Sequence, residues 1–110
     1  METDVALYLL NSPVISDFGH WSYQGPLTVA EAREIVSEGF VSAIGHLSTA
    51  NLLSKILGRQ VPVNRIPVVL EPGDRALVFQ LERRLPEGRV LGEAELLRAG
   101  YRLGLLERLP

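Results

Sequence analysis

A short apolar run, a glycine and an amphipathic segment follow one another in the middle of the chain. Phe40–Ile44 is apolar enough for a buried strand, and leucine and isoleucine then recur at helical spacing as far as Gly58. A glycine after the last apolar residue is typical of a helix end. We therefore expect a strand followed by a helix whose N-cap is Ser48 or Thr49. The apolar face of this helix is expected to consist of Leu52, Leu53, Ile56 and Leu57.

Other segments predict further strands and helices on either side of this unit. Thr28 and Glu31 have the spacing of a capping box, which predicts a helix start there. The apolar face of that helix would consist of Ala30, Ile35 and Val36. The long connection Val14–Leu27 has room for an edge strand. The other expected elements are strands at Val5–Leu10, Ile66–Leu70, Arg75–Leu81 and Tyr101–Leu106, and a short helix at Glu93–Arg98.

These elements define a fold class and one domain. The turn residues Glu71–Asp74 predict that the strands on either side of them, Ile66–Leu70 and Arg75–Leu81, form a hairpin. The fold class is therefore α/β (mixed α+β), with a mixed sheet of about five strands flanked by two or three helices. A length of 110 residues is typical of one domain, so we expect a single domain over residues 1–110.

Composition excludes several classes of protein. Hydrophobic residues make up 46% of the chain and the formal net charge is −2, which excludes an intrinsically disordered chain. No apolar run approaches the ~20 residues that a membrane-spanning helix needs. The absence of cysteine excludes a disulfide scaffold, a thiolate zinc site, an iron–sulfur cluster and a cysteine nucleophile. Without cysteine and without a signal-peptide pattern, the chain is expected in the cytoplasm and not on a membrane.

The basic residues are few but unusual in kind. Eleven basic residues stand against thirteen acidic ones, so binding of long nucleic acid through bulk charge is not expected. All of the basic residues except Lys55 are arginine, whose rigid fork can hold a phosphate or a carboxylate without a basic surface. Nucleotide composition or thermal adaptation of the source would give the same surplus and is the simpler explanation.

Common metal and cofactor motifs are missing from the sequence. The two histidines, His20 and His46, lie far apart, and no histidine or acidic pair has the spacing of metal ligands. There is also no phosphate-binding loop, no dinucleotide-binding glycine motif and no nucleophile elbow. We therefore expect neither a metal nor a cofactor.

His46 is the strongest catalytic candidate. It follows Gly45 at the junction between the expected strand and the expected helix. Glycine lets a ligand approach the backbone, and the N–H groups at a helix start attract an anion. A phosphate bound there would favour the protonated imidazole, which is the form that a general acid needs. The alternative is a histidine packed at a turn and bonded to the backbone, which is the commoner case.

A second candidate cluster lies at the end of the Arg75–Leu81 strand. Strand alternation places Gln80 on the same face as Ala76 and Val78, where small side chains would leave space for a ligand. Two arginines follow, of which only one would reach the Gln80 side if the strand continued. A solvated charge cluster at a strand end is the simpler interpretation.

Four short motifs occur in an order that resembles a known family. They are Tyr8-Leu-Leu-Asn11-Ser-Pro, Ala43-Ile-Gly-His46-x-Ser-Thr49, Val63-Asn-Arg65 and Gln80-Leu-Glu-Arg-Arg84-Leu-Pro-Glu87-Gly88. Over nearly its whole length the chain resembles the small viral ring nucleases that act as type III anti-CRISPR proteins, together with their cellular and prophage relatives. Each motif is short, and the specificity lies in their combination.

The resemblance implies an activity and partners. Such proteins are symmetric homodimers that bind cyclic tetra-adenylate, the second messenger of type III CRISPR complexes. They cut it without metal into linear di-adenylates that end in a 2′,3′-cyclic phosphate, and this switches off the effector nucleases. We expect the same activity here, in the cytoplasm of the host if the protein is encoded by a virus.

The resemblance also implies roles for individual residues. The family's catalytic histidine falls on His46, and its supporting arginine and glutamate fall on Arg84 and Glu87. The expected ligand contacts are Asn11, Ser12, Gly45, Ser48, Thr49, Arg65 and Gln80. Some relatives carry a serine three residues after the asparagine. Here that position is Val14, which leaves Ser12 as the alternative hydroxyl.

Elementary RNA chemistry agrees with these roles. The ribose 2′-OH is the nucleophile, so the protein needs only to align it with phosphorus and to protonate the leaving 5′-oxygen. His46 can supply that proton, Arg84 can offset charge on the phosphoryl oxygens, and Glu87 can orient Arg84 or a ribose hydroxyl. Two rival functions stay open. One is a protein that sequesters a cyclic nucleotide or a nucleic acid without cutting it, and the other is a structural dimer in which His46 is merely packed.

Overall fold

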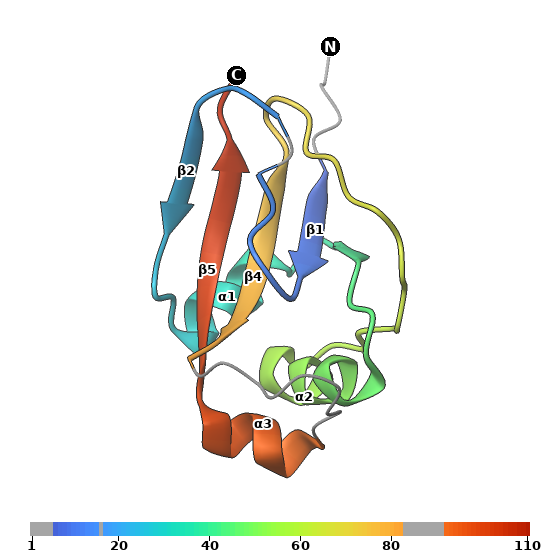
Figure 1. The fold of residues 1–110 in the computed structure, drawn as a ribbon. Helices are drawn as coiled ribbons and strands as arrows, with labels where there is room; N and C mark the ends of the chain where they lie inside the picture. Colours follow the sequence, from blue (N-terminus) through green and yellow to red (C-terminus); the bar gives the residue numbers. More distant parts are fainter. Residues whose placement is uncertain (1–5, 16, 83–91) are drawn as a thin grey trace.

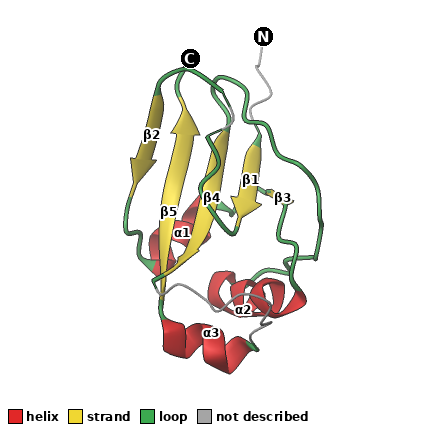
Figure 2. Ribbon diagram, viewed as in Figure 1, coloured by secondary structure: helices red, strands yellow, loops and turns green. Residues whose placement is uncertain are grey.

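The fold is a single five-stranded sheet accompanied by three helices. The computed structural model describes residues 6–15, 17–82 and 92–110. The strands are β1 (Leu7–Leu10), β2 (Trp21–Gln24), β3 (Val41–Ser42), β4 (Arg75–Leu81) and β5 (Tyr101–Arg108), and the helices are α1 (Val29–Ile35), α2 (Leu47–Leu57) and α3 (Glu93–Ala99) (Figures 1 and 2). This confirms the expected mixed α+β class with about five strands and two or three helices.

The sheet is mixed, with a parallel half and an antiparallel half. The strand order is β2-β5-β4-β1-β3. β1 lies between β3 and β4 and is parallel to both, whereas β5 lies between β4 and β2 and is antiparallel to both. The chain therefore passes to β3 on one side of β1 and then to β4 on the other side. Because β1, β3 and β4 run in the same direction, the residues that follow them gather at one edge of the sheet.

The two faces of the sheet have different coverings. Leu77 and Phe79 of β4 face the helices, in a core that also includes Leu9, Ala32, Val36, Ile44, Ala50, Leu52, Leu53, Leu57, Leu96 and Leu103. Ala76 and Val78 face the other way and pack with Leu10, Leu70 and Leu106. The predicted alternation in β4 is thus confirmed. On the second face, here called the helix-free face, this cluster is partly covered by Val14 and Val68 from connections and by Trp21 at the start of β2.

Hydrogen bonds between near neighbours determine where α1 begins. The Thr28 hydroxyl accepts from the Glu31 N–H at 3.1 Å, and Glu31 Oε1 accepts from the Thr28 N–H at 2.9 Å. This is the predicted capping box. The buried side chains are Ala32 and Val36, one turn apart, whereas Ala30 is exposed. The apolar face was therefore predicted correctly at Val36 and wrongly at Ala30.

The N-cap of α2 lies two residues before the nearest predicted position. His46 is the N-cap, and its carbonyl accepts from the Ala50 N–H at 3.0 Å. The prediction of a hydroxyl cap at Ser48 or Thr49 was wrong, because both residues lie inside the first turn and Thr49 is turned into the core. The helix ends as predicted, with Gly58 in the left-handed conformation that glycine adopts without strain.

The predicted strand at Ile66–Leu70 does not form. Residues 59–71 contain no strand and run as an irregular connection. β4 has β1 on one side and β5 on the other, so neither edge is left for a hairpin partner. The predicted hairpin was therefore wrong, although the Glu71–Asp74 turn forms with a backbone hydrogen bond of 2.9 Å. β3 is also shorter than predicted, whereas β2 is the expected edge strand within Val14–Leu27.

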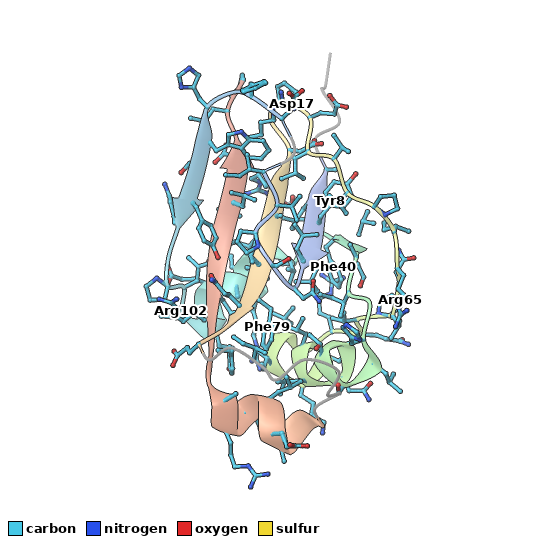
Figure 3. The ribbon with its side chains drawn as sticks, viewed as in Figure 1. Tyr8, Asp17, Phe40, Arg65, Phe79 and Arg102 are labelled. Carbon is cyan, nitrogen blue, oxygen red and sulfur yellow. The ribbon has the colours of Figure 1, made fainter. Side chains whose placement is uncertain are left out.

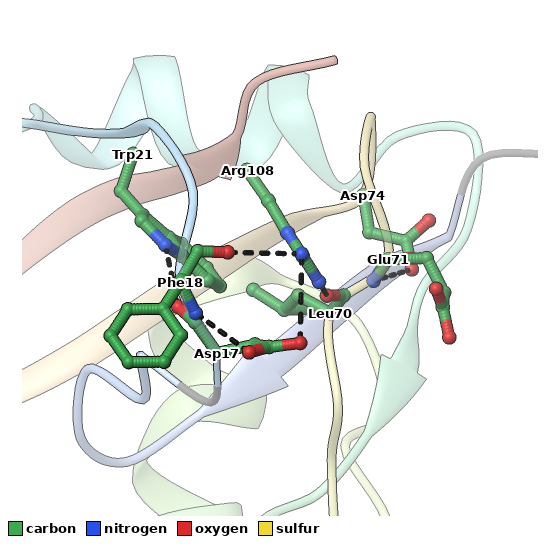
Figure 4. A network of polar contacts seen from close by, with 7 residues as sticks. All are labelled: Asp17, Phe18, Trp21, Leu70, Glu71, Asp74 and Arg108. Atoms are coloured by element: carbon green, nitrogen blue, oxygen red, sulfur yellow. Dashed lines mark hydrogen bonds and ion pairs between the residues drawn. The ribbon is translucent and has the colours of Figure 1, made fainter.

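Arg108, at the end of β5, forms hydrogen bonds to two connections on the helix-free face, one before β2 and one before β4. Its guanidinium donates to the Leu70 carbonyl at 2.7 Å and to the Phe18 carbonyl at 3.2 Å (Figure 4). The same group lies over the Trp21 ring, 5.6 Å from its centroid.

Within the residues described, no helix is long and apolar enough to cross a membrane.

Candidate functional site

The carboxyl ends of β1, β3 and β4 bring residues of separate motifs to one edge of the sheet. Asn11 and Ser12 follow β1, Gly45 and His46 follow the β3 segment, and Gln80 lies near the end of β4. Ligands of open α/β sheets commonly bind at this edge, where the strand order reverses. The topology therefore supports one site built from parts that are far apart in sequence.

His46 presents an exposed imidazole at the N-terminus of α2. Its backbone is extended, with φ −127° and ψ 133°, and its side chain makes no capping hydrogen bond to the helix. The side chain is exposed, so the alternative of a packed turn histidine does not apply. The first N–H groups of α2 lack helical partners and carry the positive end of the helix dipole. An anion at this point can contact both the backbone and the imidazole.

Arg65 lies against the backbone of Gly45. Its Nε donates to the Gly45 carbonyl at 2.7 Å. A Cβ at position 45 would approach Arg65 Cγ to 3.2 Å, so the glycine lets the arginine lie close. The neighbouring Asn64 fixes this segment, because its amide donates to the Ser42 carbonyl at 2.7 Å. Figure 3 labels Arg65 beside the start of α2. A guanidinium therefore stands next to the helix N-terminus.

These groups surround an open hollow of about 530 Å³. It is lined by Gly45, His46, Leu47, Ser48, Val63, Arg65 and Gly92. Four of the predicted site residues, namely Gly45, His46, Ser48 and Arg65, thus come together. Leu47 is 66% exposed and gives the hollow an apolar wall. The combination of N–H donors, a guanidinium and an apolar surface suits a ligand that carries phosphate together with a base or sugar.

Two other predicted contacts, Thr49 and Gln80, do not present their side chains to this hollow. The Thr49 side chain is 7% exposed, so what it can offer a ligand is chiefly its backbone in the first turn of α2. Gln80 lines a different hollow of about 170 Å³ on the helix-free face, with Tyr23, Gln24, Gly25, Pro26, Arg102, Leu103 and Gly104. Asn11 and Ser12 are exposed just beyond β1. Arg84 and Glu87 lie outside the described residues.

Sequence reasoning missed Tyr23 as a member of the Gln80 hollow. Its hydroxyl donates to Gln80 Oε1 at 3.0 Å, although 57 positions separate the two residues. Burial raises the pKa of Tyr23, and the positive charge of Arg102 acts in the opposite direction. Only the order β2-β5-β4 brings these side chains together, so no local pattern could have revealed the contact.

Comparison with known proteins assigns the chain to a family. The family model described as STIV B116-like matches residues 7–103, which include every described candidate residue named above except Gly104. The chain belongs to the STIV B116-like family. The resemblance that the four motifs indicated is therefore confirmed at the level of the family.

Within the part of the chain that is described, no three His, Asp or Glu side chains are grouped to hold a metal ion.

Relatives of similar length occur in viruses and in a bacterium. Protein 26 of Sulfolobus islandicus filamentous virus is 39% identical over 106 residues, covering 92% of this chain and 90% of its own. The ORF117 protein of Acidianus two-tailed virus is 38% identical and covers 96% and 95%. YddF of Bacillus subtilis is 33% identical and covers 91% and 94%. The solved structure of B116 from Sulfolobus turreted icosahedral virus matches with a TM-score of 0.72 and 27% identity, covering 94% of this chain and 99% of that one.

Proposed function

We propose that this protein is a metal-independent ring nuclease for cyclic tetra-adenylate. The observation that carries the proposal is the exposed imidazole of His46 at the N-terminus of an 11-residue helix, beside the guanidinium of Arg65. This arrangement supplies a proton donor and a phosphate cradle in one hollow. Membership of the STIV B116-like family supports the proposal, because the motifs of the resemblance fall within the matched residues.

The scissile phosphate would sit at the start of α2. The N–H groups of the first turn donate to its oxygens, and Arg65 adds a charge-assisted contact. Gly45 lets the Arg65 side chain lie against the backbone next to this phosphate. Asn11, Ser12 and Ser48 are the polar side chains expected around the adjoining riboses and bases. The apolar wall at Leu47 gives a base or sugar a surface to lie on.

The reaction is an internal transesterification of RNA. The ribose 2′-oxygen attacks phosphorus, so a P–O2′ bond forms while the P–O5′ bond breaks. Protonated His46 gives its proton to the leaving 5′-oxygen, which becomes a hydroxyl, and the attacking hydroxyl loses its proton to solvent or a base. Two such cuts convert the ring into two linear di-adenylates with 2′,3′-cyclic phosphate ends. Arg84 and Glu87 are proposed to stabilise the phosphoryl charge and to orient groups around it, and both lie outside the described residues.

We propose that the active form is a homodimer, which suits the symmetry of such a ring. Cyclic tetra-adenylate has two-fold symmetry, so a symmetric dimer can place one His46 at each of two opposite phosphates. The described surface carries exposed apolar side chains suited to burial, with Phe18 95% exposed and Ile15 65% exposed. In a cell with a type III CRISPR system, cleavage in the cytoplasm would remove the signal that activates effector nucleases.

The alternative function is a sponge that binds the ring and leaves it intact. The observation behind it is that the His46 side chain makes no capping hydrogen bond at α2, so the first N–H groups of the helix can bind a phosphate whether or not the imidazole transfers a proton. Arg65 and the helix N-terminus would bind a phosphate equally well in such a protein. Turnover separates the two functions, because a sponge returns its ligand uncut.

The decisive experiment measures turnover of cyclic tetra-adenylate in excess over protein, with EDTA present. We expect many turnovers by the wild type and a loss of ~100- to 10,000-fold in His46→Ala, the usual contribution of a general acid. His20→Ala is the matched control, because His20 is exposed before β2 and should leave the rate unchanged. Tight binding with the ring recovered intact would establish the sponge instead. If the protein neither binds nor cleaves the ring, both proposed functions are overturned.

A further inference from the structure

The hollow around Gln80 contains a contact that the proposed reaction does not explain. Tyr23 comes from the edge strand β2, and its hydroxyl donates to Gln80 Oε1 of β4 at 3.0 Å. β5 lies between these two strands, so the hydrogen bond spans three strands on the helix-free face. We propose that Tyr23 is a positioning residue that fixes the Gln80 carboxamide, so that its NH₂ group rather than its oxygen is presented to the ligand.

Gly104 makes this contact possible. It lies on β5 between the two side chains, and a Cβ there would come within 2.6 Å of Tyr23 Cε1 and 3.1 Å of the Tyr23 hydroxyl oxygen. Only a glycine lets the tyrosine ring lie flat enough on the sheet to reach across to Gln80. The tyrosine ring thus lies over the β5 backbone at Gly104 on one side, while the residue stays 46% exposed.

The protonation state of Tyr23 suits this role. Burial raises the pKa of the phenol, although Arg102 acts in the opposite direction. The hydroxyl therefore keeps its proton at neutral pH and donates it to the amide oxygen. Once this oxygen is engaged, the remaining hydrogen-bonding capacity of Gln80 is mainly that of its two N–H donors.

The chemistry of the hollow indicates which ligand groups it accepts. Arg102 is the register partner of Gln80 across β4 and β5, and its side chain is exposed (Figure 3). Two neighbouring side chains thus offer N–H donors, which match a phosphate oxygen or an acceptor nitrogen of a purine. This inference rests on the proposed function, because cyclic tetra-adenylate carries both kinds of acceptor.

A double-mutant cycle tests whether Tyr23 acts through Gln80. Affinity for intact cyclic tetra-adenylate is measured in the His46→Ala background with Tyr23→Phe, Gln80→Ala and both changes. We expect Tyr23→Phe to weaken binding by ~3- to 10-fold, the usual effect of one lost neutral hydrogen bond, and to have no effect when Gln80 is already alanine. With His46 intact, Tyr23→Phe should raise KM by a similar factor and leave kcat unchanged. An equal loss in both backgrounds, or no loss in either, would overturn the proposal.

A second readout needs no ligand. The NMR signals of the Gln80 NH₂ group are identified by their absence from Gln80→Ala. In Tyr23→Phe they should move towards the positions of solvent-exposed glutamines and exchange faster with water. Tyr101→Phe is the matched control, since it removes a hydroxyl from the opposite face of the sheet. Unchanged signals in Tyr23→Phe would overturn the positioning role, whereas failure of the wild type to bind the ring would overturn the proposed function.

Discussion

Single arginines explain part of the unusual basic composition. Arg33 donates through Nε to the Ile56 carbonyl at 2.8 Å, and Arg59 donates to the Ser37 carbonyl at 2.7 Å. These contacts join the end of α1 to the end of α2, where the helix dipole favours a cation. Arg65 and Arg102, by contrast, flank the two hollows. Some of the arginines therefore hold the fold together, and two others lie at the hollows.

The Gly104 position gives a residue-level prediction. Gly104→Ala forces a methyl group into the Tyr23 ring, and overpacking of this kind costs about 1–3 kcal/mol of unfolding free energy. In a Tyr23→Ala background the same change should cost much less, because the obstructing ring is gone. Denaturant unfolding of the four proteins measures both costs. Equal costs in the two backgrounds would show that the ring is not what excludes a side chain at position 104.

Arg108 gives a second residue-level prediction. Replacing it by methionine removes its bonds to the Leu70 and Phe18 carbonyls while keeping much of its apolar stem. We expect the unfolding free energy to fall by about 1–3 kcal/mol, since the Arg108 side chain is only 14% exposed. Arg98→Met, at an exposed position on α3, is the matched control and should change stability by less than about 0.5 kcal/mol. Equal unfolding free energies for the two variants would show that the Arg108 guanidinium does not stabilise these connections.

Elements were predictable where their signals are local. The Thr28–Glu31 capping box and the Gly58 helix end are formed by residues within one turn of each other, so the sequence alone identifies them. The Ile66–Leu70 segment fails for the opposite reason. Its composition favours a strand, but whether it pairs depends on which strands occupy the edges of β4. That competition is settled by distant parts of the chain and leaves no local signal.

The same distinction applies to the candidate site. The Gly45-His46 turn before a helix could be identified from adjacent residues, and the structure places both in one hollow. Arg65 reaches that hollow because its segment bonds to the carbonyls of Ser42 in β3 and of Gly45 after it, and the motif alone does not show this. The Tyr23–Gln80 contact depends on the full strand order. Local patterns therefore indicated the catalytic candidate better than the residues that surround it.

The capping box of α1 predicts how stability depends on pH. Its hydrogen bonds from the Thr28 backbone and side chain lower the pKa of Glu31 below the ordinary value of 4.5. As pH falls through this range the unfolded chain takes up the proton first, so the stabilisation that is present above pH 4.5 is lost below it. Unfolding free energy measured from about pH 6 to pH 3 should therefore fall less steeply in Glu31→Gln than in the wild type. Glu34→Gln is the control on the same helix, and parallel curves for wild type and Glu31→Gln would contradict the account.

At the scale of the whole molecule, topology is what assembles the site. The parallel strands β1, β3 and β4 bring three sequence motifs to one edge, while the antiparallel pair β5 and β2 extends the helix-free face beyond Gln80. The two hollows belong to these two parts of the sheet. In the proposed homodimer, two-fold symmetry would repeat both hollows.

The central claim is that the ligand supplies the nucleophile and the protein supplies the acid. Its most direct test is cyclic tetra-adenylate with 2′-fluoro in place of each 2′-hydroxyl, incubated with the wild-type protein in EDTA. We expect this ring to compete with the natural one for binding and to be recovered uncut, while the natural ring yields di-adenylates ending in a 2′,3′-cyclic phosphate. Cleavage of the fluorinated ring would show that water or a protein group attacks phosphorus, and the proposed reaction would be wrong.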